Sequence, residues 1–138
     1  MSYVIDGVAP ALAADAFVRG EGRRPTSVSE FRGSWIVVAF AVRSADVLEL
    51  AALEEAFAAD GALVLATTPE DWHEVAHRYA GEPVRFPILT QVAETRRVTM
   101  IVDPLGIVRH VGLRRSVRET LAVLEELVVS PVAAQLAA

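Results

Sequence analysis

Two histidines one helical turn apart come closest to a catalytic motif in this chain. His73, Glu74 and His77 spell H-E-x-x-H, the string in which two histidines bind zinc and the glutamate acts as a general base. At positions i and i+4 of a helix both imidazoles point the same way and could contact one metal ion. The string therefore raises zinc-dependent hydrolysis as a first hypothesis.

The sequence around this string lacks a suitable third zinc ligand. A catalytic zinc needs three protein ligands and one open position. The only other histidine, His110, lies in a predicted strand, and Glu94 lies in a short connection. Arg78 follows the second histidine, and it suits a surface ion pair with Glu74 at i, i+4. We therefore interpret the string as a solvated helix face and expect no metal there.

The chain of 138 residues contains no cysteine, which removes thiol nucleophiles, disulfides and cysteine-ligated metals. All 13 basic residues are arginines. A hydrophobic content of 53% indicates a globular protein, and no apolar run approaches the roughly 20 residues that span a bilayer. The first residues lack the features of a secretory signal. We expect a cytoplasmic protein without a cofactor or a membrane partner.

The charge of the chain is uneven along its length. The net charge of −5 argues against a nucleic-acid partner. Residues 46–82 hold nine carboxylates and one arginine, whereas residues 85–118 hold seven arginines and two carboxylates. Such runs of charge usually correspond to two solvent-exposed faces of the protein. They could also orient two copies of the chain in self-association. A homodimer is therefore one hypothesis, and no other partner is indicated.

Hydrophobic patterning predicts a single domain over residues 1–130, followed by a tail over residues 131–138. Strands are expected at residues 11–19, 35–40, 62–66, 86–89, 98–102 and 107–111, with a mobile tip at 20–25 and a tight turn at 29–33. Helices are expected to begin at Ser44, Thr68 and Ser116, each as N-cap, and to end near Gly61, Gly81 and Ser130. The continuous apolar run 35–40 predicts a central strand, and residues 35–66 predict a parallel strand–helix–strand unit. Residues 103–106 (DPLG) are expected to form a type I hairpin turn between the last two strands. The layout is that of an α/β sandwich.

Four segments in this order resemble a known family. They are residues 7–10 (GVAP), residues 27–35 (SVSEFRGSW), residues 67–70 (TTPE) followed by 86–89 (FPIL), and residues 97–110 (RVTMIVDPLGIVRH). Together they resemble the redoxin group of the thioredoxin superfamily, and within it the alkyl hydroperoxide reductase/thiol-specific antioxidant (peroxiredoxin) family. The resemblance implies a thioredoxin-like three-layer α/β/α sandwich around a central mixed β-sheet. It also implies a thiol peroxidase activity.

The sequence departs from that family at the reactive cysteine. Relatives carry it just after the central strand, at the N-terminus of the next helix, whereas residues 41–48 read AVRSADVL. Ser44 is nearest to a thiol in shape, but a hydroxyl pKa is too high for attack on peroxide, so we expect Ser44 to cap the helix. The connection between Leu89 and Arg97 is also shorter than in active relatives. The chain is therefore interpreted as catalytically inactive, with a binding or assembly role.

The resemblance also places a candidate ligand site. Arg97 and Thr99 occupy positions that face the reactive site in relatives. One interpretation makes them inert remnants, with Arg97 in an ion pair. In the other, Arg43, Ser44, Arg97 and Thr99 form a site for a small anion or an acidic peptide at the former active site, helped by free N–H groups of the helix. A zinc site at His73 and His77 remains the third alternative.

Overall fold

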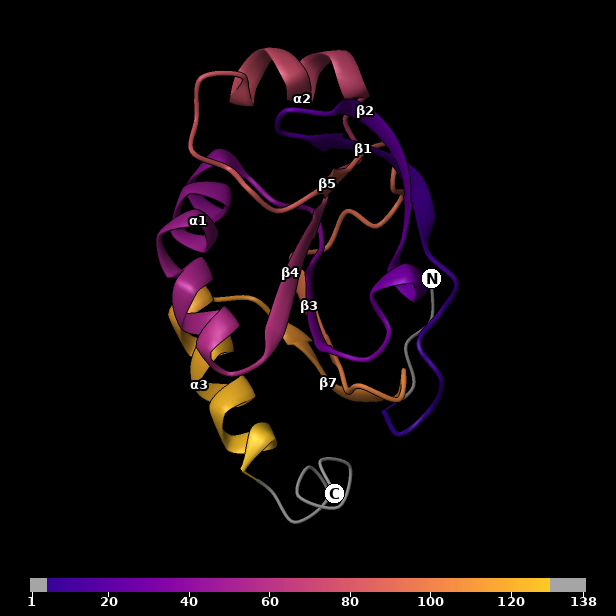
Figure 1. The fold of residues 1–138 in the computed structure, drawn as a ribbon, viewed down its shortest axis with the longest axis vertical. Coiled ribbons are helices and arrows are strands. Elements are labelled where there is room, and N and C mark those ends of the chain that lie inside the picture. The colour runs from indigo at the N-terminus through magenta and orange to yellow at the C-terminus, as the bar shows by residue number, and fades with distance from the viewer. Residues whose placement is uncertain (1–4, 130–138) are drawn as a thin grey trace.

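The computed structural model of the protein describes residues 5–129, which fold around a seven-stranded sheet (Figure 1). The strands are β1 (Ala13–Val18), β2 (Gly22–Ser27), β3 (Trp35–Ala39), β4 (Ala62–Thr67), β5 (Ile88–Leu89), β6 (Val98–Val102) and β7 (Val108–Leu113). The helices are the 3-10 turn η1 (Val28–Phe31) and the α-helices α1 (Ser44–Ala59), α2 (Trp72–Tyr79) and α3 (Val117–Val128). The sheet order is β2-β1-β5-β4-β3-β6-β7.

The sheet is mixed, and β3 lies in its interior as predicted. β3 pairs with β4 in parallel and with β6 antiparallel, while β4 and β5 are parallel. All five residues of β3 are buried, with Val37 facing one core cluster and Ile36 and Val38 facing the other. The predicted parallel unit β3–α1–β4 is confirmed, and Gly61 ends its helix with a φ of +77°.

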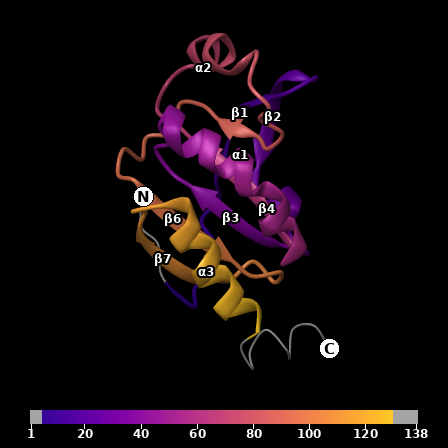
Figure 2. The same cartoon turned by 90° about the vertical axis from the view of Figure 1, so that its left-hand side faces the viewer.

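The two faces of the sheet are covered differently. α1 and α3 cross one face of the sheet (Figure 2). Leu50, Phe57 and Leu124 of these helices belong to the same core cluster as Val37 of β3. α2 packs against β1, with the rings of Trp72 and Phe17 6.5 Å apart. On the opposite face, η1 and the segments flanking β1 and β5 contribute Leu12, Val28 and Val92 to the second core cluster. The predicted α/β sandwich with a central mixed sheet is confirmed, and α-helices cover only one face of it among residues 5–129.

Several predicted boundaries were wrong. α1 begins at Ser44 with Arg43 at the N-cap, so Ser44 is not the cap. α2 begins at Trp72 and is capped by Asp71, not by Thr68. Residues 22–25, predicted as a mobile tip, lie in the hairpin strand β2. The N-cap role of Ser116 is confirmed, because its hydroxyl accepts the Glu119 N–H at 3.2 Å.

The strands β6 and β7 form the predicted hairpin. The N–H of Gly106 donates to the carbonyl of Asp103 at 2.9 Å, and Gly106 has a φ of +86°. The Asp103 carboxylate is fully buried and accepts from Leu105 N–H and from Arg109 Nε. Within residues 5–129, no helix has the length and apolar character to cross a bilayer. The predicted tail 131–138 and the helix end at Ser130 lie outside the described residues.

Candidate functional site

A buried carboxylate lies where α1 begins. Asp46, in the first turn of α1, is 5% exposed. Its Oδ2 accepts the backbone N–H of Arg43 at 3.0 Å, and its Oδ1 accepts Nη2 of Arg97 at 2.5 Å. The carboxylate therefore satisfies one free N–H of the helix start and binds the arginine that precedes β6. It places a negative charge at the positive end of α1.

A second arginine contacts the carboxylate of Asp46. Arg114, which follows β7, is 5% exposed. Its Nη2 donates to the carbonyl of Phe40 at 2.8 Å and to Asp46 Oδ2 at 3.3 Å, and its Nη1 donates to the carbonyl of Val98 at 3.0 Å. One guanidinium thus joins the end of β3, the start of β6 and the first turn of α1.

The electrostatics of this cluster favour the charged carboxylate. Burial alone would raise the pKa of Asp46, but the hydrogen bonds from Arg43 N–H, Arg97 and Arg114 outweigh it and lower that pKa. Burial lowers the pKa of Arg114, and Asp46 offsets part of this effect. Arginine stays protonated in proteins, so two guanidiniums face one carboxylate. We name Asp46, Arg97 and Arg114 the ion triad.

The structure brings together only part of the predicted site. Arg43 and Arg97 meet through Asp46, the first by its backbone N–H and the second by its side chain. Ser44 is exposed on the first turn of α1 and has no hydrogen bond to Arg97 or Thr99 within residues 5–129. The hydroxyl of Thr99 is buried without a described partner, and it lines a separate hollow of about 130 Å³ with His110 and Ser116.

Two members of the ion triad were missed from the sequence. Asp46 stands three residues after the N-cap, where a carboxylate commonly accepts the cap N–H, and this signal could have identified it. Arg114 has no local signal, because its partners Phe40 and Asp46 are 74 and 68 residues away. The predicted ion pair of Arg97 is present and partly buried, with an exposed side-chain fraction of 35%.

The H-E-x-x-H string lies on the outer side of α2. His73 and His77 are exposed, and the ring of His73 makes an edge contact with Trp72 at 5.4 Å. Arg78 pairs with Glu70 at 2.6 Å, so the predicted pair with Glu74 was wrong. In the part of the chain that the structure describes, no three His, Asp or Glu side chains are grouped so that they could hold a metal ion.

The order of the strands in the mixed sheet and the helix that follows the interior strand are those of a thioredoxin-like fold. The structure is similar to Mycobacterium bovis AhpC, with a TM-score of 0.80 and 21% sequence identity over 94% of this chain and 95% of that one. It is also similar to the reduced 2-Cys peroxiredoxin of Plasmodium vivax, with a TM-score of 0.81 and 15% identity over 91% of this chain and 96% of that one. The predicted thioredoxin-like fold and redoxin resemblance are thereby confirmed as a likeness of fold. No protein-family model matches the sequence, and no curated protein matches it.

Proposed function

We propose that this chain is a peroxiredoxin-like scaffold without thiol peroxidase chemistry, and that it serves a binding or assembly role. The observation that carries the proposal is the carboxylate of Asp46. The resembled family has its reactive cysteine at the start of the helix after the central strand. Here the buried anion in that first turn belongs to Asp46, held by Arg97 and Arg114. The arginines that would stabilise a thiolate therefore bind a group that peroxide does not oxidise.

The chemistry available at this site supports the same proposal. Peroxide reduction requires a thiolate sulfur that attacks one peroxide oxygen and becomes a sulfenic acid. The chain contains no cysteine. Ser44 is exposed beside the site, and no hydrogen bond to an activating base is described for its hydroxyl. A serine without such a base is a poor nucleophile.

A peroxidase assay tests the loss of catalysis. We expect the purified chain, given hydrogen peroxide or an alkyl hydroperoxide with dithiothreitol or a thioredoxin system, to consume peroxide at the rate of the protein-free mixture. An active 2-Cys peroxiredoxin in the same assay serves as the positive control. Consumption clearly above the protein-free rate, proportional to the concentration of the chain, would contradict the proposal.

The excess positive charge of the ion triad favours a second candidate, binding of a small anion or an acidic peptide at Arg43, Ser44 and Arg97, without Thr99, which lines a separate hollow. Two guanidiniums of the triad face one carboxylate, and Arg97 Nε has no described partner. The exposed Arg43 side chain adds a third cation at the positive end of α1. An anion would bind outside Asp46 and would not displace it.

Thermal unfolding tests this second candidate. We expect millimolar phosphate or sulfate to raise the melting temperature of the wild type by several degrees relative to chloride at equal ionic strength, because a ligand that binds the folded state stabilises it. Arg43→Gln should lose most of this rise, whereas Arg19→Gln, the same charge change in the β1–β2 turn, should keep it. A flat response across anions, or equal responses of both variants, would exclude this site.

A further inference from the structure

A second hollow lies at the opposite end of β3 from the ion triad. Its volume is about 220 Å³, and it is on the sheet face that carries no α-helix among residues 5–129. Ile36 of β3 and Val102 of β6 form its floor, and both are almost fully buried. Residues 9–13 and the start of η1 form its walls. The hollow therefore has an apolar interior built from four separate segments.

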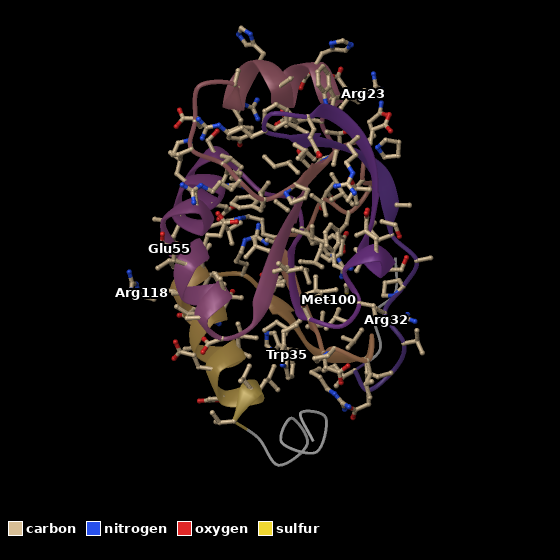
Figure 3. All side chains as sticks on the ribbon, viewed as in Figure 1. Arg23, Arg32, Trp35, Glu55, Met100 and Arg118 are labelled. Carbon is tan, nitrogen blue, oxygen red and sulfur yellow. The ribbon has the colours of Figure 1, made fainter. Side chains whose placement is uncertain are left out.

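One positively charged side chain lines this hollow. Arg32, just after η1, is the only charged residue among those lining it. Its side chain lies on the far side of the sheet from Glu55 of α1 and Arg118 of α3 (Figure 3). No hydrogen bond or ion pair is described for the Arg32 guanidinium within residues 5–129. The nearest carboxylate in sequence, Glu30, is engaged by Arg24 at 2.9 Å and by Ser27 N–H at 2.8 Å.

The turn beside the hollow leaves room for the Arg32 side chain because it has a glycine there. A Cβ atom at Gly106 would lie 2.9 Å from Arg32 Nε, so the guanidinium rests against a residue that has no side chain. A φ of +86° also favours glycine at this turn position. Any larger residue would push the guanidinium away from the turn. The glycine of the β6–β7 turn and the arginine after η1 therefore form one side of the hollow together.

Two hydroxyl groups lie on the same wall. The Oγ atoms of Ser27 and Ser29 are 2.8 Å apart, and either can donate to the other. Whichever hydroxyl donates in this pair, the hydrogen of the other remains available to a ligand. The hollow thus combines an apolar floor with a guanidinium that has no partner among residues 5–129 and with one hydroxyl hydrogen that the Ser27–Ser29 pair does not use. This is the small set of polar groups in an apolar pocket that orients a ligand.

We propose that this hollow binds a small monocarboxylate with an apolar body, its carboxylate on Arg32 and its hydrocarbon part over Ile36 and Val102. A cavity of about 150 Å³ accommodates benzene, so about 220 Å³ suits a body of roughly ten non-hydrogen atoms, such as an aromatic acid or a medium-chain acyl acid. The guanidinium fork matches the carboxylate geometry, and the apolar floor disfavours a free inorganic anion. The site goes beyond the proposed function, since it involves neither the ion triad nor any residue of the former active site.

Amide chemical-shift titration of the full chain tests the proposal, with benzoate and octanoate as probes. We expect saturable shifts, with a dissociation constant on the order of 1 mM or lower for ligands of this size. The shifts should cluster at residues 9–13, 27–32 and 102–106. Benzyl alcohol and octanol, which lack the charge, should bind at least tenfold more weakly.

Matched variants separate the proposed contacts from general effects. Arg32→Gln should weaken octanoate binding about tenfold or more, whereas Arg19→Gln, with the same charge change far from the hollow, should leave it unchanged. Ala9→Leu, which fills the hollow, should abolish saturation while the spectrum remains that of a folded protein. Absence of saturation up to 20 mM, shifts clustered at Arg43 and Arg97, or equal affinities of the two arginine variants would each overturn the proposal.

Discussion

Replacing Asp46 by alanine is expected to lower the free energy of unfolding by about 3–5 kcal/mol. The substitution leaves the Arg114 guanidinium buried beside Arg97, two like charges without the carboxylate between them. It also removes the acceptor of the Arg43 N–H at the start of α1. Removing one partner of a buried charge cluster is costly because the remaining charge has lost its compensation and cannot reach water.

Urea denaturation at pH 7 measures this effect. Glu55→Ala is the matched control, because Glu55 lies on the same helix, is exposed and has no described partner. We expect the control to change the free energy of unfolding by no more than about 0.5 kcal/mol. A loss below about 1 kcal/mol for Asp46→Ala would show that water enters the site and that the carboxylate contributes little there.

The pH dependence of stability provides a second measurement of the same interaction. The pKa of Asp46 is lowered in the folded chain, so its contribution is present above the unfolded-state value of about 3.9 and is lost as pH falls through the folded-state value. Asp46→Asn carries no titratable group at this position. The difference in stability between wild type and Asp46→Asn should therefore shrink as the pH is lowered from about 5 toward 2. A constant difference over this range would contradict the lowered pKa.

The parts of the fold that were predicted correctly are those that short stretches of sequence determine. The apolar run of β3 is typical of a buried strand. The sequence of residues 103–106 is typical of a hairpin turn. The wrong helix starts also have a local reason. Asp71 and Thr68 both offer an oxygen before α2, and Thr68 accepts Glu70 N–H in a short turn of its own, which leaves the cap to Asp71.

The candidate site could be predicted only in part, because its contacts join segments far apart in the chain. The family resemblance indicated Arg97, yet its partner Asp46 is 51 residues earlier. The position of Arg114 depends on the pairing of β6 with β7, in which Val98 stands opposite Leu113 and so brings the next residue to the end of β3. Thr99 was predicted to belong to the same site, but it lines a separate hollow with Thr120 and Val123 of α3. Such placements follow from strand register, which side-chain patterns alone do not determine.

Replacing Arg114 by methionine is expected to cost about 3–5 kcal/mol, even though Asp46 keeps Arg97 and the Arg43 N–H as partners. The carbonyls of Phe40 and Val98 lose the hydrogen bonds that this guanidinium donates, at the point where β3 passes into α1. Arg115→Met is the matched control, because the neighbouring Arg115 is exposed and should cost no more than about 0.5 kcal/mol.

The double variant Asp46→Ala/Arg114→Met shows what the ion triad contributes to the fold. If the two side chains act as one unit, the double variant should be more stable than the sum of the two single changes predicts, by about 0.5–3 kcal/mol. It should remain less stable than the wild type, because the hydrogen bonds that Arg114 donates to the carbonyls of Phe40 and Val98 are still lost. That result would make the triad a structural link between β3, β6 and α1, which explains why charged residues persist at a site without a thiol. Strict additivity would instead show that Asp46 and Arg114 are held independently, and the charge itself would then require a ligand to account for it.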